Sequence, residues 1–355
     1  MKSLALSVHF RLPEQGMRHH EVLTRASAFF VDASKSKFLQ IVPKRNRPMV
    51  HCIASSHVLC PWLWKSYYPL DWIQLVKREH CTYAVEVIDK NAKVIEKFPL
   101  NPYPILHPSL DVGIIHLKDE DNALKKMISL GVEVPLPLRH KKKTLGDGDK
   151  VYFEGFEIKN LDKSVSPEES ESDTRVHVPF ITDGSVISPA TDRDLIETSH
   201  VLTDGLCGAP VMDEHGFVAG IVEGIVPTDH DNPFLAGAGA TVTSSAIHNF
   251  LDQSEELMMK KILPESLINK LYHARKAIQK RGGTIPADFF ESVIHSKVGE
   301  TFSEEEKNKL VKIVEDVSFG KDFEINFNDL EKMANRMKDD RQAEEEQENS
   351  NREKK

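Results

Sequence analysis

The spacing of apolar and polar positions changes once along the chain. From residue 24 to about residue 138, short apolar runs such as ASAFFVDA, MVHCIAS and VGIIHL are separated by Pro, Gly, Asn and Asp. Short runs interrupted by turn-forming residues are typical of strands in a β-barrel or sandwich. A second stretch of this kind begins with LGDGDKVYFEGFEI. The pattern therefore predicts two β units in series, over residues 24–138 and 139–254.

Helical spacing dominates the last third of the sequence. In SLINKLYHARKAIQ and EEKNKLVKIVEDV, apolar residues recur every three to four positions, which predicts a helical appendage over residues 255–337. Residues 338–355 are almost all charged or amide-bearing and predict a disordered tail. Residues 1–23 are predicted to form an N-terminal extension before the first β unit.

Composition narrows the classes of function. The chain has 355 residues, of which 40% are hydrophobic and 28% charged, the balance of a soluble globular protein. A net charge of −9, without a basic array interleaved with aromatics, argues against nucleic acid as partner. No apolar run reaches the roughly 18 residues of a membrane helix, so we expect no membrane span. Four cysteines are too few for a disulfide framework. We therefore predict an intracellular, reducing compartment, such as the cytoplasm or the mitochondrion, and no secretion.

Three segments carry residue types suited to nucleophilic catalysis. His57 follows the apolar run VHCIAS, Asp111 precedes VGIIHL, and Cys207 lies in DGLCGAP. Each alone has a structural explanation, as a turn residue or a small buried thiol. Together they supply a nucleophile, a base, and a carboxylate that orients the base. The sequence thus predicts a catalytic triad of His57, Asp111 and Cys207.

Glycines around the cysteine suggest an oxyanion hole. A tight turn can direct the backbone N–H groups of Gly205 and Cys207 toward one point, where they stabilise the charge that develops on a carbonyl oxygen. A plain glycine-rich hairpin turn explains the glycines equally well, but not the flanking pattern.

The order His, Asp, nucleophile carries a family resemblance. Together with the runs ASAFFVDA, SLDVGIIHL and DLIETSHVLTDGLCGAPVMDEHGFVAGIVEG, it resembles the trypsin-like peptidases of the chymotrypsin clan, and among them the HtrA/Deg group. The resemblance spans about residues 24–252. It implies a mainly β fold with a chymotrypsin-like double β-barrel. Here the α-helical C-terminal appendage follows in place of the PDZ domain of that group. The resemblance also implies an endopeptidase that cleaves a polypeptide substrate through an acyl-enzyme on Cys207, with no cofactor and no metal.

Departures from the family pattern limit what can be transferred. Leu206 stands where trypsin-type zymogens carry an aspartate, so activation by N-terminal cleavage is not implied. The cysteine resembles that of the picornaviral proteases, but Glu223 replaces the histidine with which those enzymes select glutamine. The resemblance assigns the substrate pocket to Val201, Val222, Glu223 and Gly224, with Glu223 facing either the pocket or solvent.

Two functions of different classes remain open. One is an active endopeptidase, and the other is a catalytically inactive protein that uses the β units as a scaffold or binding module in a larger complex. In both cases the C-terminal helices can dock a protein partner. The helices also resemble a pair of EF-hands, but Phe323 stands where the second loop needs a glycine for its sharp turn. We therefore predict a calcium-free pair or an unrelated helical bundle.

Overall fold

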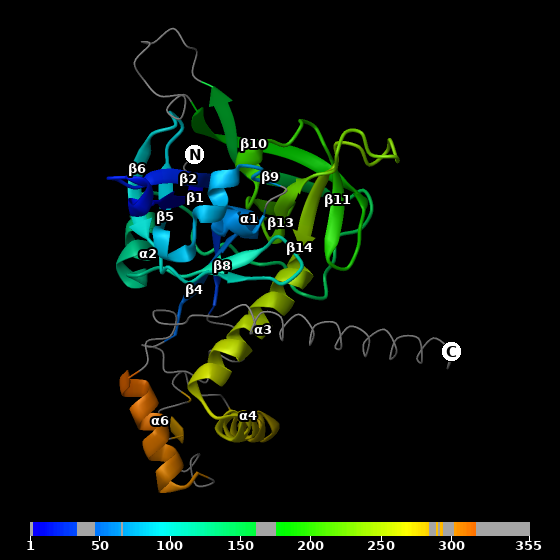
Figure 1. Ribbon diagram of the computed structural model, residues 1–355. Helices are drawn as coiled ribbons and strands as arrows, with labels where there is room; N and C mark the ends of the chain where they lie inside the picture. Colours follow the sequence, from blue (N-terminus) through cyan, green and yellow to red (C-terminus); the bar gives the residue numbers. More distant parts are fainter. Residues whose placement is uncertain are drawn as a thin grey trace, which may run out of the picture.

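The structure is a computed structural model that describes residues 3–33, 47–64, 67–160, 175–283, 289, 292–293 and 302–316. It is mainly β, with helices following the β part of the chain (Figure 1). This confirms the expected fold class in its coarse form.

The first half of the chain forms two four-stranded sheets. One has the strand order β2-β1-β5-β6, and the other has the order β3-β4-β8-β7. Hydrogen bonds between the described strands do not close this half into a barrel, so the strand pairing supports only one barrel of the expected two. The strands are β1 (Ser3–Phe10), β2 (Glu21–Ser27), β3 (Phe29–Asp32), β4 (Val50–Ala54), β5 (Cys81–Ile88), β6 (Val94–Pro99), β7 (Ile105–Leu106) and β8 (Gly113–Ile115).

Residues 1–23, predicted as an N-terminal extension, contain strand β1, which is part of a sheet. This strand lies between β2 and β5 and pairs antiparallel with both. Leu4, Leu6, Val8 and Phe10 alternate along it and are all buried in one apolar cluster. This period-two pattern is the ordinary signature of a strand, and it was present in the sequence.

The second half of the chain is a closed barrel of six strands in the order β10-β11-β14-β13-β12-β9. Closure leaves no open sheet edge, because the first and last strands of the order also pair. The strands are β9 (Lys150–Asn160), β10 (Arg175–Ser188), β11 (Arg193–Thr198), β12 (Pro210–Asp213), β13 (Val218–Ile225) and β14 (Gly239–Thr243).

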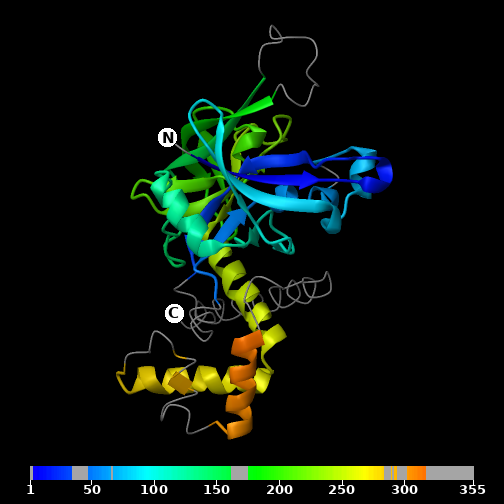
Figure 2. The same cartoon turned by 90° about the vertical axis from the view of Figure 1, so that its left-hand side faces the viewer.

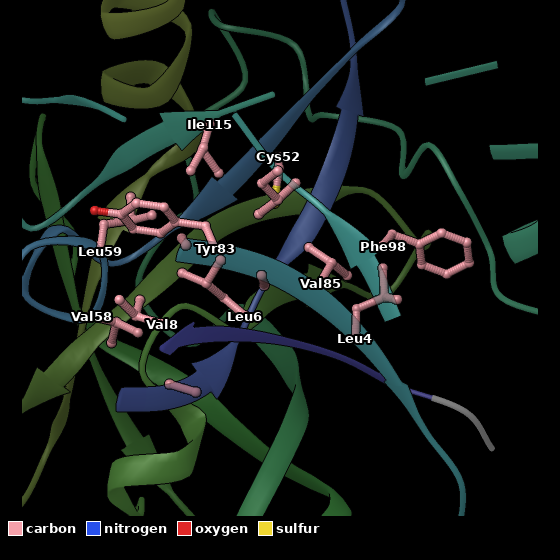
Figure 3. Packing of buried hydrophobic residues seen from close by; sticks show 14 of the residues in the cluster. Leu4, Leu6, Val8, Cys52, Val58, Leu59, Tyr83, Val85, Phe98 and Ile115 are labelled. Carbon is pink, nitrogen blue, oxygen red and sulfur yellow. The ribbon is translucent and has the colours of Figure 1, made fainter. Parts of the chain in front are cut away.

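An apolar core anchors the short helix α1 (Ser56–Leu59) in the first half. Its Val58 and Leu59 are at most 2% exposed and pack with Leu6 and Val85 from the adjoining sheet (Figure 3). Burying side chains of this size stabilises the fold by about 1.5–3 kcal/mol each. The helix therefore has a fixed position on the sheets.

Helices make up the end of the described chain. Helix α3 (Ser244–Ile262) begins directly after β14, extends across the predicted domain boundary at residue 255, and packs against β13 and β14. Its start is capped by Thr243, whose Oγ1 accepts a hydrogen bond from the N–H of Ala246, a typical N-cap. Helix α2 (Glu120–Ser129) belongs to the first half, while α4 (Glu265–Lys280) and α6 (Glu304–Asp316) lie away from the sheets (Figures 1 and 2).

The remaining structural predictions have mixed outcomes. None of the described helices combines the length and apolar character needed to cross a membrane. All four cysteines are buried free thiols, and the compartment stays a prediction. The proposed second EF-hand loop and the tail over residues 338–355 lie outside the described residues.

Candidate functional site

Strand pairing brings His57 and Asp111 together. His57 lies in α1, directly after β4, and Asp111 comes shortly before β8. The two strands run antiparallel with Ala54 opposite Gly113, so the end of one meets the start of the other. A Cβ atom at Gly113 would lie only 2.6 Å from the Leu59 side chain, and glycine therefore permits this close approach.

Asp111 orients His57 through two hydrogen bonds. The backbone N–H of His57 donates to Oδ1 at 2.9 Å, and the ring Nδ1 lies 2.5 Å from Oδ2. Asp111 is only 1% exposed and His57 only 4% exposed, so water competes little for these bonds. A carboxylate on Nδ1 selects the tautomer that carries its proton there and leaves Nε2 as an acceptor. This is the orientation that a general base requires.

Cys207 follows a tight turn that is clamped between the two halves of the chain. The turn is a short 3₁₀ helix, η8 (Asp204–Leu206). Gly208 has φ +81°, and a Cβ atom there would lie 2.3 Å from the carbonyl oxygen of Ser27, so only glycine fits. The hydroxyl of Ser27 donates to the carbonyl oxygen of Gly205 at 2.7 Å.

His57 and Cys207 line one cleft of about 1150 Å³. Strand β2 of the first half forms one side, and Ile158, His177 and Gly224 of the barrel contribute to the other. The volume exceeds the roughly 300–1,000 Å³ of usual small-ligand sites. An extended peptide therefore has room in it.

The thiol of the predicted triad is not bonded to the imidazole. Within the described part of the chain, no hydrogen bond joins Cys207 Sγ to His57. Cys207 is 8% exposed. Burial, together with the carboxylates of Asp111 and Asp204, raises the pKa of its thiol to about 12. The thiol is therefore protonated at neutral pH and needs a base to become a nucleophile.

One donor of the predicted oxyanion hole is already engaged. The backbone N–H of Cys207 donates to the carbonyl oxygen of Asp204 at 3.2 Å, closing the η8 turn. A donor that is bonded within the protein cannot also stabilise a substrate oxygen without a change in the turn. This bond does not involve the backbone N–H of Gly205, which remains a predicted donor of the oxyanion hole.

Aromatic side chains cover the imidazole. The ring of Tyr67 stacks on His57 with 4.3 Å between centroids and an angle of 11°, and Trp64 meets the same imidazole edge-on at 6.4 Å. Sequence reasoning missed both residues. The signal that was available is the concentration of aromatics just after the predicted base, in PWLWKSYYPL.

The four residues predicted to form the substrate pocket lie in different surroundings. Gly224 lines the cleft, whereas Val222 is 1% exposed and belongs to the barrel core, and Val201 is 70% exposed. Glu223 forms a bidentate ion pair with Arg193, at 2.5 and 2.8 Å. Its carboxylate is thus paired with a residue of β11, a strand that β14 separates from β13 in the barrel.

Comparisons with known proteins give little beyond this geometry. No protein-family model and no curated protein matches the sequence. Two similar solved structures are crystal structures of the Rv3671c protease from M. tuberculosis, one in the active form and one of an inactive serine-to-alanine mutant. Both are 13% identical and cover 69% of this chain, with TM-scores of 0.38 and 0.35 and coverage of 78% and 82% of the matched chains. At this level of similarity, nothing about the activity of this chain follows from them.

Proposed function

We propose that this protein is a cysteine endopeptidase of the chymotrypsin type, with Cys207 as nucleophile, His57 as general base and Asp111 as the carboxylate that orients the base. One observation carries the proposal: Asp111 fixes the imidazole by two hydrogen bonds, and that imidazole lines the same cleft as the thiol. A buried aspartate with this bonding leaves Nε2 available for proton transfer.

The reaction follows from the roles of the three side chains. Nε2 of His57 takes the thiol proton as Cys207 Sγ attacks the carbonyl carbon of a peptide bond. The tetrahedral intermediate collapses when His57 returns the proton to the departing amine, which leaves a thioester. Water, deprotonated by the same imidazole, then hydrolyses the thioester and restores the thiol. Because burial raises the pKa of Cys207, the reaction depends on this base.

The described arrangement corresponds to a resting site. For catalysis, Cys207 Sγ has to come within hydrogen-bonding distance of His57, and the Cys207 N–H has to leave the Asp204 carbonyl oxygen. A peptide that enters the cleft can supply the binding free energy for such a rearrangement.

Labelling with a peptidyl chloromethyl ketone tests the proposal. We expect alkylation of Cys207 in the wild type and a loss of rate of at least about 100-fold in His57→Ala, the range that removal of a general base produces. Cys81→Ala is the matched control, because Cys81 is a free thiol outside the cleft. Equal labelling of the wild type and His57→Ala would refute a coupled pair.

A second function is favoured by two of the same observations. The raised pKa of Cys207 and its engaged backbone N–H both suit a protein that binds a polypeptide in the cleft without cleaving it. In that case a panel of peptides yields no products with the wild type, and Cys207→Ala binds a peptide with unchanged affinity. In both functions the C-terminal helices remain the predicted docking surface for a protein partner.

A further inference from the structure

Strands β4 and β8 carry a second group of buried titratable residues, away from the cleft. His51 lies on β4, and His116 directly follows β8. Nδ1 of His51 lies 2.9 Å from Nε2 of His116, and Nε2 of His51 lies 2.8 Å from Oε1 of Glu255. Glu255 belongs to helix α3, 204 positions along the chain from His51. The three residues are at most 5% exposed.

We propose that the hydrogen-bonded chain Glu255–His51–His116 is a proton-dependent latch that fastens helix α3 to strand β4. In the fastened form the carboxyl group of Glu255 is protonated and donates to Nε2 of His51, while Nδ1–H of His51 donates to Nε2 of His116. Every bond in this arrangement has one donor and one acceptor, and no member is charged. The inference goes beyond the proposed function and does not depend on it.

The surroundings favour the neutral form. Burial lowers the pKa of His51 and of His116, and it raises the pKa of Glu255 to about 9. Asp32 of β3 opposes the shift at His51, and Asp252 of α3 adds to the shift at Glu255. The three effects of burial agree with one another, because burial disfavours the charged form of each group that is removed from water.

One more titratable group faces the chain from α3. His248 lines the same small cavity, and its Nε2 lies 2.9 Å from the carbonyl oxygen of Arg139. Burial lowers the pKa of His248 below its ordinary value of 6.5. It is therefore neutral over the pH range in which Glu255 would respond.

A cavity of about 320 Å³ gives the chain a path for protons. His51 and Glu255 both line it, together with Asp32 and Asp252. Water held in this cavity by these polar groups can carry a proton between solvent and the Glu255 carboxyl group. When that proton leaves, both imidazoles can change tautomer and keep their hydrogen bonds, but the carboxylate charge stays buried.

The sign of the pH dependence follows from these shifts. Glu255 has a raised pKa, so its contribution to docking is complete below its ordinary value of 4.5 and is lost as the pH rises toward about 9. His51 has a lowered pKa, so its contribution is complete above 6.5 and is lost as the pH falls. Docking of α3 is therefore strongest in mildly acidic solution and weakens as the pH rises through neutrality.

Hydrogen exchange of the α3 amides in the full-length protein tests the latch. Corrected for intrinsic exchange rates, the opening equilibrium of α3 should rise about tenfold per pH unit between about pH 6.5 and about pH 8.5, because opening releases one proton. Glu255→Gln keeps a donor toward His51 but cannot ionise, so its α3 opening should be independent of pH over this range. The matched control is Glu256→Gln on the same helix, which breaks a partly exposed pair with Lys260, leaves Glu255 in place and should keep the wild-type slope.

Equal slopes in the wild type and Glu255→Gln would overturn the proposal, and so would a flat wild-type profile, which indicates that the docked form already holds an ionised Glu255 beside a neutral His51. Should Glu255→Gln fail to fold, infrared titration of the wild type decides. A protonated buried carboxyl that ionises near pH 9 supports the latch, and the absence of such a group at neutral pH refutes it.

Discussion

The strand pair β4 and β8 carries two histidine sites of opposite character, one at each end. His57 is bonded to Asp111 through Nδ1, and within the described residues its Nε2 has no hydrogen-bond partner, whereas His51 is bonded at both ring nitrogens. An imidazole with one available nitrogen in a large cleft can exchange a proton with a ligand. An imidazole bonded on both sides passes protons only along its own chain. We therefore expect chemistry at the first end and helix docking at the second.

The largest effect that would separate the two ends is expected from Asp111→Asn. The amide NH₂ cannot accept from Nδ1–H, so the imidazole adopts the other tautomer and Nε2 becomes a donor. It then cannot take the proton of Cys207. Alkylation of Cys207 by a peptidyl chloromethyl ketone, followed by mass spectrometry over time, should slow by about 10³- to 10⁴-fold.

Glu255→Gln is the matched variant at the other end of the strands. It alters the partner of His51 and leaves the bonds of His57 untouched, so the alkylation rate should stay within about twofold of the wild type. Comparable slowing in both variants would mean that the two ends do not have separate roles.

The same two ends differ in how far the sequence could predict them. His57 and Asp111 stand next to apolar strand segments, and antiparallel pairing of such segments brings their ends together. The His51–Glu255 contact joins a strand to a helix 204 positions away, and no local pattern marks either residue. Sequence patterns report which face of an element is buried, but they do not identify the distant element that covers it.

The other differences between the predicted and the observed structure have similar physical causes. The alternation along β1 is visible in the sequence, but the family resemblance begins only at about residue 24, so the first 23 residues are predicted to form an extension. Closure of a β-sheet depends on which edge strands meet, and the apolar runs of the first half carry no information about this. Glu223 was expected to face a pocket or solvent. Its partner Arg193 lies on another strand of the barrel, and the sequence does not show that these two strands bring the side chains together. The mainly β character and the C-terminal helices follow directly from spacing.

A smaller effect, on stability, tests how the cleft end is held by the barrel. Gly208→Ala should lower the free energy of unfolding by at least about 2 kcal/mol, because the residue has positive φ and its Cβ would clash with the Ser27 carbonyl oxygen. Urea denaturation followed by circular dichroism measures this. Gly216→Ala is the matched control, since Gly216 has φ +77° but open space around it, and should cost only about 1 kcal/mol. Equal losses would show that the contact with Ser27 contributes nothing.

The smallest effect is expected from Tyr67→Ala. This variant tests whether the Tyr67 ring that stacks on His57 limits the access of a reagent to the cleft. Tyr67 stacks on one face of the imidazole, and a stacked pair contributes about 0.5–1.5 kcal/mol. Its removal should therefore raise the rate at which iodoacetamide alkylates Cys207 by about two- to tenfold. Trp72→Ala is the control, because Trp72 stacks on Phe10 and not on His57. A rate that is unchanged in Tyr67→Ala, or raised equally in both variants, would mean that the stacked ring does not limit access to the cleft.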